Sequence, residues 1–99
     1  MRTQTYRTEL EIISTILEIM MNVGMSGEYV TTIVRNANLS HTVAMDKIDK
    51  LINANLIRAS EKEGKRIFII TENGIKFYRD LTNFQEFVKE VQIKGSKIT

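Results

Sequence analysis

The sequence predicts an α+β fold that is mostly helical, with three helices, a β-hairpin and a long final helix. Three observations support this prediction. Apolar residues recur at helical spacing in four segments, two short β-rich runs flank a charged tip, and a chain of 99 residues has room for a single domain. Hydrophobic residues make up 42% of the chain and charged residues 26%, which is typical of a globular protein.

The first helix is expected from Thr8 to Val23. Its apolar residues form two neighbouring stripes at helical spacing, and together these are wider than the surface that one small domain usually covers. We therefore expect the second stripe, with Ile12, Ile16 and Ile19, to contact the last helix of a second subunit. The first stripe consists of Leu10, Ile13, Leu17, Met20 and Met21.

Two shorter helices follow a turn at residues 24–27. One is expected from Glu28 to Ala37, where an acidic first residue suits the positive end of the helix dipole. The next is expected over residues 41–53, because Ser40 is a favourable N-cap. Asn55 then supplies a residue that tolerates the left-handed conformation at a helix C-terminus.

A β-hairpin is predicted after these helices. The runs Leu56–Ser60 and Arg66–Ile70 are rich in residues that favour strands, and a charged five-residue tip, Glu61–Lys65, separates them. Gly64 gives this tip the backbone freedom that a tight turn needs.

The last helix is expected to begin after Thr71 and to continue to about Gln92. Its apolar positions follow the spacing of an a/d seam over about two heptads. Since a helix of about 20 residues spans about 30 Å, it extends beyond so small a domain, and we expect its seam to form a homodimer interface. The expected interface residues on this helix are Phe77, Leu81, Phe84, Phe87, Val88 and Val91.

Four parts are therefore expected along the chain. Residues 1–7 form a flexible basic arm, residues 8–71 the domain, residues 72–92 the dimerisation helix and residues 93–99 a flexible tail. No apolar run approaches the roughly 20 residues of a membrane span, and the N-terminus lacks the apolar segment of a secretory signal.

Two helices joined by a short turn and followed by a hairpin form the winged helix-turn-helix plan. The chain resembles the small archaeal winged-helix proteins, of chromatin and regulator types, in which a long C-terminal helix forms an antiparallel coiled-coil dimer. This resemblance covers roughly residues 8–91 and implies binding of double-stranded DNA as a dimer. Two features depart from the pattern. Asn55 stands where these proteins usually have Gly, and the third helix carries acidic residues. The matching residues are Asn38-Leu39-Ser40, Leu51, Leu56-Ile57, Gly64-Lys65 and Thr71-Glu72-Asn73-Gly74.

The third helix is the recognition helix in this plan, and its N-terminal part faces the major groove. Thr42 can donate or accept a hydrogen bond, and Met45 can touch a thymine methyl group. Asp46 and Asp49 are repelled by phosphate, so we expect weak base contacts from this helix. The alternative for each position is an ordinary solvated helix face. The candidate DNA contacts on this helix are His41, Thr42, Met45, Asp46, Lys47 and Lys50.

The composition of the hairpin is stronger evidence for DNA binding than that of the third helix. Its cations outnumber Glu61 and Glu63 and leave a charge of +2 over nine residues. A wing that lies along phosphates needs such cations, because neutralising phosphates releases condensed counterions. The alternative is a charged tip that is kept polar for solubility. The candidate phosphate contacts are Arg58, Lys62, Lys65 and Arg66.

Other classes of function find less support. No catalytic residues and no phosphate-cradling loop are recognisable, so neither an enzyme nor a cofactor is expected. The chain has no cysteine, and the single histidine, His41, gives no metal site. The competing function is a protein–protein module within a larger assembly. One positive face formed by the third helix and the hairpin indicates DNA instead, and the protein is then expected in the cytoplasm with the nucleoid.

Overall fold

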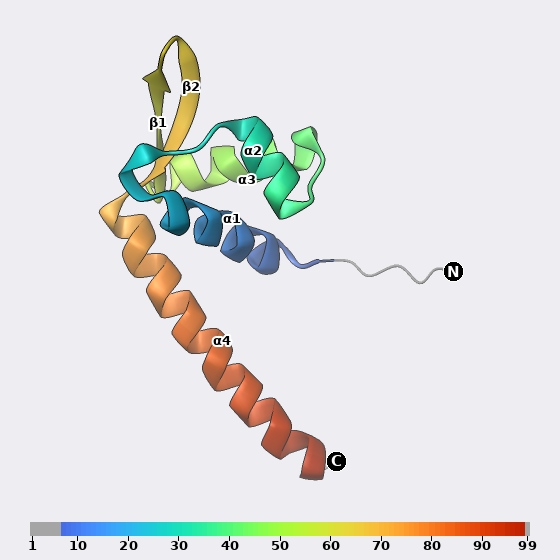
Figure 1. Ribbon diagram of the computed structural model, residues 1–99. Coiled ribbons are helices and arrows are strands. Elements are labelled where there is room, and N and C mark those ends of the chain that lie inside the picture. Colours follow the sequence, from blue (N-terminus) through green and yellow to red (C-terminus); the bar gives the residue numbers. More distant parts are fainter. Residues whose placement is uncertain (1–6, 99) are drawn as a thin grey trace.

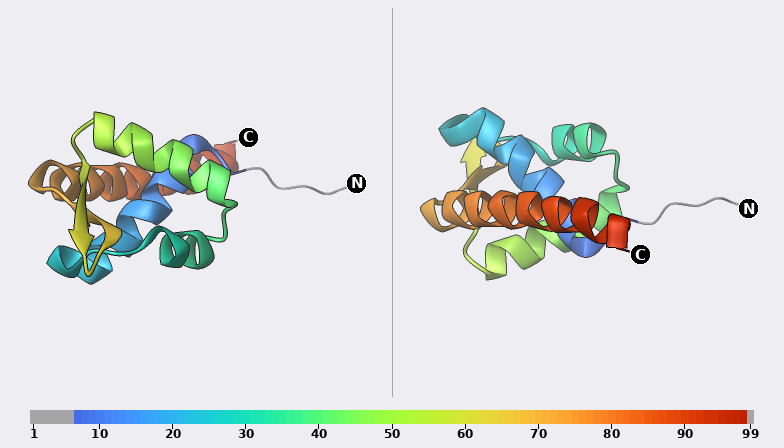
Figure 2. Two further views of the ribbon diagram at one scale, coloured as in Figure 1. Left: turned by 90° about the horizontal axis from the view of Figure 1, so that it is seen from above. Right: turned by 90° about the horizontal axis from the view of Figure 1, so that it is seen from below.

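The computed structural model describes residues 7–98, and side chains up to residue 91. Two helices and a hairpin lie on one side of α1, and α4 lies on its other side (Figures 1 and 2). This is the mostly helical α+β arrangement that the sequence predicts. The elements are α1 (Glu9–Val23), the 3-10 turn η1 (Gly24–Ser26), α2 (Val30–Ala37), α3 (His41–Asn53), β1 (Ile57–Lys62), β2 (Lys65–Ile70) and α4 (Glu72–Ile98).

Side-chain caps fix the starts of α1 and α3. Thr8 accepts a hydrogen bond from the backbone N–H of Glu11, whose carboxylate accepts one from the N–H of Thr8, so the two residues form a capping box. Ser40 accepts from the N–H of Val43 at 3.1 Å and starts α3 at the predicted residue. Both caps satisfy donors that have no partner within the helix.

Helix α2 begins two residues later than predicted. Glu28 is not helical, because its N–H and C=O both bond to Phe68 of β2, each at 2.9 Å. This bridge adds a third short extended segment beside the hairpin. It joins residues far apart in the chain, so the local pattern that suggested a helix start at Glu28 could not reveal it.

The hairpin is longer and its turn tighter than predicted. Strands β1 and β2 pair antiparallel from Ile57↔Ile70 to Lys62↔Lys65. The turn is therefore Glu63-Gly64 alone, with φ values of 52° and 76°, and not a five-residue tip. Two central residues with positive φ characterise the tight turn that matches the twist of paired strands.

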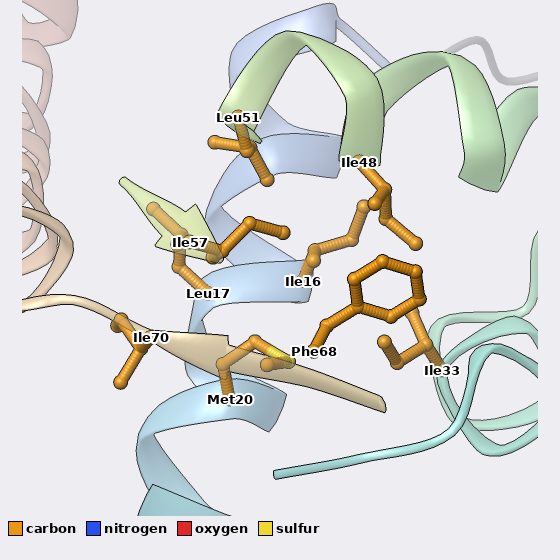
Figure 3. Packing of buried hydrophobic residues seen from close by; sticks show 9 residues of the cluster. All are labelled: Ile16, Leu17, Met20, Ile33, Ile48, Leu51, Ile57, Phe68 and Ile70. Carbon is orange, nitrogen blue, oxygen red and sulfur yellow. The ribbon is translucent and has the colours of Figure 1, made fainter. Parts of the chain in front are cut away.

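The core lies where α1 meets α2, α3 and the hairpin (Figure 3). Ile16 is fully buried there, beside Phe68 and Ile48. The expectation that Ile16 contacts a second subunit is therefore wrong, because the protomer's own elements cover that stripe of α1. Ile12 and Ile19 are half-buried and pack against the same core. The buried cluster comprises Ile16, Leu17, Met20, Ile33, Ile48, Leu51, Ile57, Phe68 and Ile70.

Helix α4 runs away from this core and makes the molecule elongated (Figure 1). The radius of gyration is 15.4 Å, whereas a compact chain of 100 residues has about 13 Å. The helix ends at Ile98, beyond the predicted end at Gln92, so residues 93–98 are helical and not a tail. No proline interrupts the chain. No helix among residues 7–98 is long and apolar enough to span a membrane.

Arg7 is held by the domain and is not part of a free arm. Its Nη1 donates to the carbonyl oxygen of Ala37 at 2.8 Å, and its Nη2 donates to Oγ1 of Thr15 at 3.1 Å. It thereby ties the start of α1 to the end of α2. The rest of the predicted arm, residues 1–6, lies outside the described residues, as does residue 99.

Candidate nucleic-acid interface

The hairpin projects beyond the helices, and α2 and α3 lie beside its base (Figure 1). Helices α1 and α4 lie on the far side of this layer (Figures 1 and 2). The predicted recognition helix and the predicted wing therefore share one side of the molecule.

The four wing cations, Arg58, Lys62, Lys65 and Arg66, are all exposed, but they do not share one face of the hairpin. Residues directly opposite in a strand pair point to the same face. Arg66 is opposite Glu61 and lies on the face of Phe68, with its guanidinium 5.0 Å from the centre of that ring. The other three cations alternate onto the opposite face.

Within the described side chains, the wing cations have no acidic partners. Among residues 7–91, none of the four forms an ion pair. Lys65 and Arg66 together border a groove whose other wall is the start of α2, at Tyr29, Val30 and Thr31. Cations that are exposed and unpaired keep their full charge available to an anionic partner.

The lysines of α3, in contrast to the wing cations, form ion pairs with acidic residues. Nζ of Lys47 lies 3.3 Å and Nζ of Lys50 lies 2.5 Å from the same oxygen, Oε2 of Glu9 on α1. Asp46 adds a second acidic neighbour, with its Oδ2 at 3.1 Å from Lys47 and 3.9 Å from Lys50. The side chain of Lys47 is only 15% exposed. Both predicted lysine contacts are thus already paired with carboxylates.

These ion pairs keep their partners charged at neutral pH. Hydrogen bonds from Lys50 and then Lys47 lower the pKa of Glu9 below its ordinary value. The hydrogen bond to Asp46 raises the pKa of Lys47, with a smaller contribution from Glu9. The network therefore carries three charged groups from α3 and one from α1.

The exposed side of α3 differs from the predicted contact surface at two positions, Met45 and Lys47, which are half-buried. His41, Thr42, Asp46 and Lys50 are exposed, as a contact surface requires. Met45 is half-buried and packs against the core, so only part of its side chain is open to solvent, and its contact with a thymine methyl group stays a prediction.

Sequence reasoning missed two residues beside this surface. Val43 is 37% exposed on α3, and the helical positions of its buried neighbours could have shown this. Glu9 is 38 residues from Lys47 in sequence, and no local sequence pattern indicates that the two are in contact.

Charge is unevenly distributed over the two elements. Around the exposed side of α3, the acidic residues Glu9, Asp46 and Asp49 outnumber the lysines Lys47 and Lys50 by one. The wing retains its excess of two positive charges. The positive charge that the sequence predicts over both elements is therefore confined to the wing, where it is divided between the two faces of the hairpin.

The first half of the predicted seam on α4 packs against the protomer's own core. Leu81 is buried, and Phe77 is half-buried against the core, so these two do not offer a free surface to a second subunit. Farther along, Phe84 and Phe87 are 58% and 60% exposed. Val91 is also exposed, and Val88 is half-buried.

A groove between α1 and α4 continues this apolar surface. Leu10, from the first apolar stripe of α1, is exposed and lines the groove with Phe84 and Val88. Glu11, Glu86 and Lys89 lie along it as charged neighbours. In the part of the chain that the structure describes, no three acidic or histidine side chains gather in a way that could hold a metal ion.

Comparisons with known proteins agree on the fold. A family model described as winged helix-turn-helix matches residues 6–89. The structure of Sso10a-2, a DNA-binding protein from Sulfolobus solfataricus, superposes with a TM-score of 0.79 and 19% identity over 93% of each chain. Among curated proteins, no sequence matches the chain.

Two larger regulators are also similar. MepR, a transcription regulator of the Staphylococcus aureus multidrug efflux pump MepA, has a TM-score of 0.73 and 13% identity over 85% of this chain and 63% of its own. The PcaV transcriptional regulator from Streptomyces coelicolor has a TM-score of 0.74 and 16% identity over 81% of this chain and 60% of its own. The chain thus spans less than two thirds of either regulator.

Proposed function

Since the chain belongs to the winged helix-turn-helix family, we propose that it binds double-stranded DNA as a homodimer, as a transcription regulator or an architectural chromatin protein. Similar solved structures include a DNA-binding protein and two transcription regulators. The proposal assigns no catalytic activity, cofactor or metal to the chain, and it places the protein with the nucleoid in the cytoplasm.

The observation that carries this proposal is the unpaired charge of the wing. Arg58, Lys62, Lys65 and Arg66 project with the hairpin, and none has an acidic partner among residues 7–91. Cations in this state gain most from phosphate, because binding releases the counterions condensed on DNA. The groove that Lys65 and Arg66 share with the start of α2 offers a track for one strand of the backbone.

Helix α3 has a smaller part in this proposal. Its N-terminal residues His41 and Thr42 are exposed and can reach base edges. Asp46 and Asp49 are exposed beside them and repel phosphate. We therefore assign most of the affinity to the wing and only limited base contact to α3.

The second half of α4 supports the homodimer. Exposed Phe84, Phe87 and Val91 continue the seam whose first half is buried in the protomer, and such a run of large apolar side chains marks an interaction surface. A second copy of α4 has the matching surface, which suits a two-fold contact. If its recognition helices lie about 34 Å apart, such a dimer can engage two successive major grooves on one face of DNA.

One experiment tests the function directly. Wild-type protein is titrated against labelled duplexes of a selected and a random sequence, side by side, at several salt concentrations. We expect binding of both duplexes at low salt and a linear fall of log K with log salt concentration. The acidic balance of α3 favours one alternative, a protein–protein module, and absence of binding to either duplex at the lowest salt concentration supports that alternative.

A further inference from the structure

Glu9, the first residue of α1, accepts hydrogen bonds from both lysines of α3. We infer that Glu9 is a positioning residue that holds Lys47 and Lys50 away from the phosphate backbone and so lowers the affinity of α3 for DNA. This inference rests on the DNA binding proposed above and adds a control on the same surface. It explains physically why the wing leads the interaction.

The geometry makes Glu9 a single acceptor for two cations. Lys47 and Lys50 are three residues apart, so they lie on the same side of α3. Their Nζ atoms converge on one carboxylate oxygen, Oε2, at 3.3 Å and 2.5 Å. The contact spans 38 and 41 residues of sequence, so it joins the start of α1 to the middle of α3 only in the folded protein.

These two lysines are the whole basic content of α3 apart from His41. While both are paired with Glu9, the helix has no lysine free to meet a phosphate. To contact DNA, a lysine has to leave Glu9 and pair with a phosphate. The negative charges of Glu9 and Asp46 then lie near the DNA with less positive charge to balance them. Exposed ion pairs are individually weak, so we expect a graded reduction of affinity and not a complete block.

The effect of Glu9 on DNA affinity is expected to depend on salt concentration. The screening length is about 10 Å at 0.1 M salt, and Glu9 is in direct contact with the lysines that it controls. We therefore expect the Glu9 carboxylate to act on phosphate approach at low salt and to lose influence as salt concentration rises. Loss of its charge leaves Asp46 as the acidic neighbour of both lysines and so makes the two cations more available to phosphate.

The test compares Glu9→Gln with Glu18→Gln on a random duplex at several salt concentrations. Glu18 is exposed on the same helix, half a turn out of phase with Glu9, and forms no ion pair among residues 7–91. The two variants therefore change net charge equally. Circular dichroism verifies that both fold.

We expect Glu9→Gln to raise affinity about threefold to tenfold at low salt, and to steepen the log–log salt slope by up to about 1.8, given roughly 0.9 per phosphate contact. Glu18→Gln keeps the wild-type slope. Equal slopes and equal affinities for the two variants overturn the inference.

A second comparison shows whether the effect passes through the lysines. Lys47→Gln with Lys50→Gln is expected to change wild-type affinity little, and to abolish the gain when combined with Glu9→Gln. If the lysine substitutions weaken the wild type as much as they weaken the Glu9→Gln protein, the inference is wrong, although the proposed function stands. If no protein in the set binds duplex at the lowest salt concentration, the proposed function and this inference both fail.

Discussion

At the scale of single residues, Gly74 fixes how the long helix leaves the wing. A Cβ at this position would lie 2.7 Å from Cγ1 of Ile70 and closer still to the carbonyl oxygen of Leu56. That carbonyl already accepts a hydrogen bond from Thr71 N–H at 3.0 Å, and Thr71 Oγ1 accepts one from Gly74 N–H at 2.9 Å. The backbone before the wing and the first turn of α4 are thus packed without space for a side chain.

Gly74→Ala is therefore expected to lower the free energy of unfolding by about 1–3 kcal/mol, the usual cost of forcing extra volume into a packed site. This loss has to exceed the roughly 1 kcal/mol that alanine gains over glycine within a helix. Denaturant unfolding of Gly74→Ala is compared with Asn73→Ala, an exposed neighbour for which we expect a change within about 0.5 kcal/mol. A Gly74→Ala protein as stable as the wild type contradicts the packing described here.

At the scale of elements, α3 combines one side that builds the core with one that faces solvent. Ala44, Ile48 and Leu51 are buried, and Met45 packs beside them. Thr42 is within one helical turn of Ala44 and Met45 but is exposed. The two neighbouring candidates, Thr42 and Met45, therefore have different roles.

We expect Thr42→Ala to leave stability and random-duplex affinity nearly unchanged, and to weaken a preferred site by about 1–3 kcal/mol if Thr42 makes a good base contact. Met45→Ala is expected to lower the free energy of unfolding by about 1–2 kcal/mol, below the range for a fully buried methionine. Thermal unfolding and titration of both duplexes measure these effects. Equal loss of affinity for all sequences in Thr42→Ala would place Thr42 on the DNA backbone instead.

Elements that depend on local pattern were predictable from the sequence. The bounds of α3 follow from Ser40 as its cap and from the periodicity of its apolar residues. Asn55 adopts the expected left-handed conformation, with φ of 63°. The winged helix-turn-helix plan itself is confirmed by the family match over residues 6–89.

Features that depend on distant residues were not predictable. The bridge from Glu28 to Phe68 and the contact from Glu9 to α3 exist only after folding. The charged pair Lys62↔Lys65 continues the strands although its composition suggested a loop. Periodicity shows that the stripe with Ile16 is apolar but not which element covers it, so the sequence alone predicts a subunit interface where the structure has the core.

At the scale of the whole molecule, α4 determines the shape. The principal extents are 56 × 36 × 21 Å, and the helix diverges from α1 along its length (Figures 1 and 2). The seam is therefore buried near the hairpin and exposed toward the C-terminal end. An exposed apolar helix face on an otherwise ordinary small domain is the physical basis of the proposed homodimer.

Phe84→Glu with Val88→Glu is expected to yield a folded monomer with reduced DNA affinity. Phe84 is 58% exposed in the protomer, so the core does not need it, whereas two carboxylates facing two others across a two-fold contact repel each other. Sedimentation at tens of micromolar measures the mass, and Arg79→Gln with Asn83→Glu changes the charge equally at exposed positions. Either a monomeric wild type or a double variant with unchanged mass contradicts the proposed dimer.

The central claim is that duplex DNA binds through the wing, and the salt dependence of one wing variant tests it most directly. Lys65→Ala with Arg66→Ala removes the two cations that border the groove beside α2. Lys76→Ala with Arg79→Ala removes the same charge from exposed positions of α4. On a random duplex, we predict that the wing variant binds more weakly and that its log–log salt slope is shallower by up to about 2, at roughly 0.9 per phosphate contact, while the α4 variant keeps the wild-type slope. A wing variant with the wild-type slope would contradict the claim.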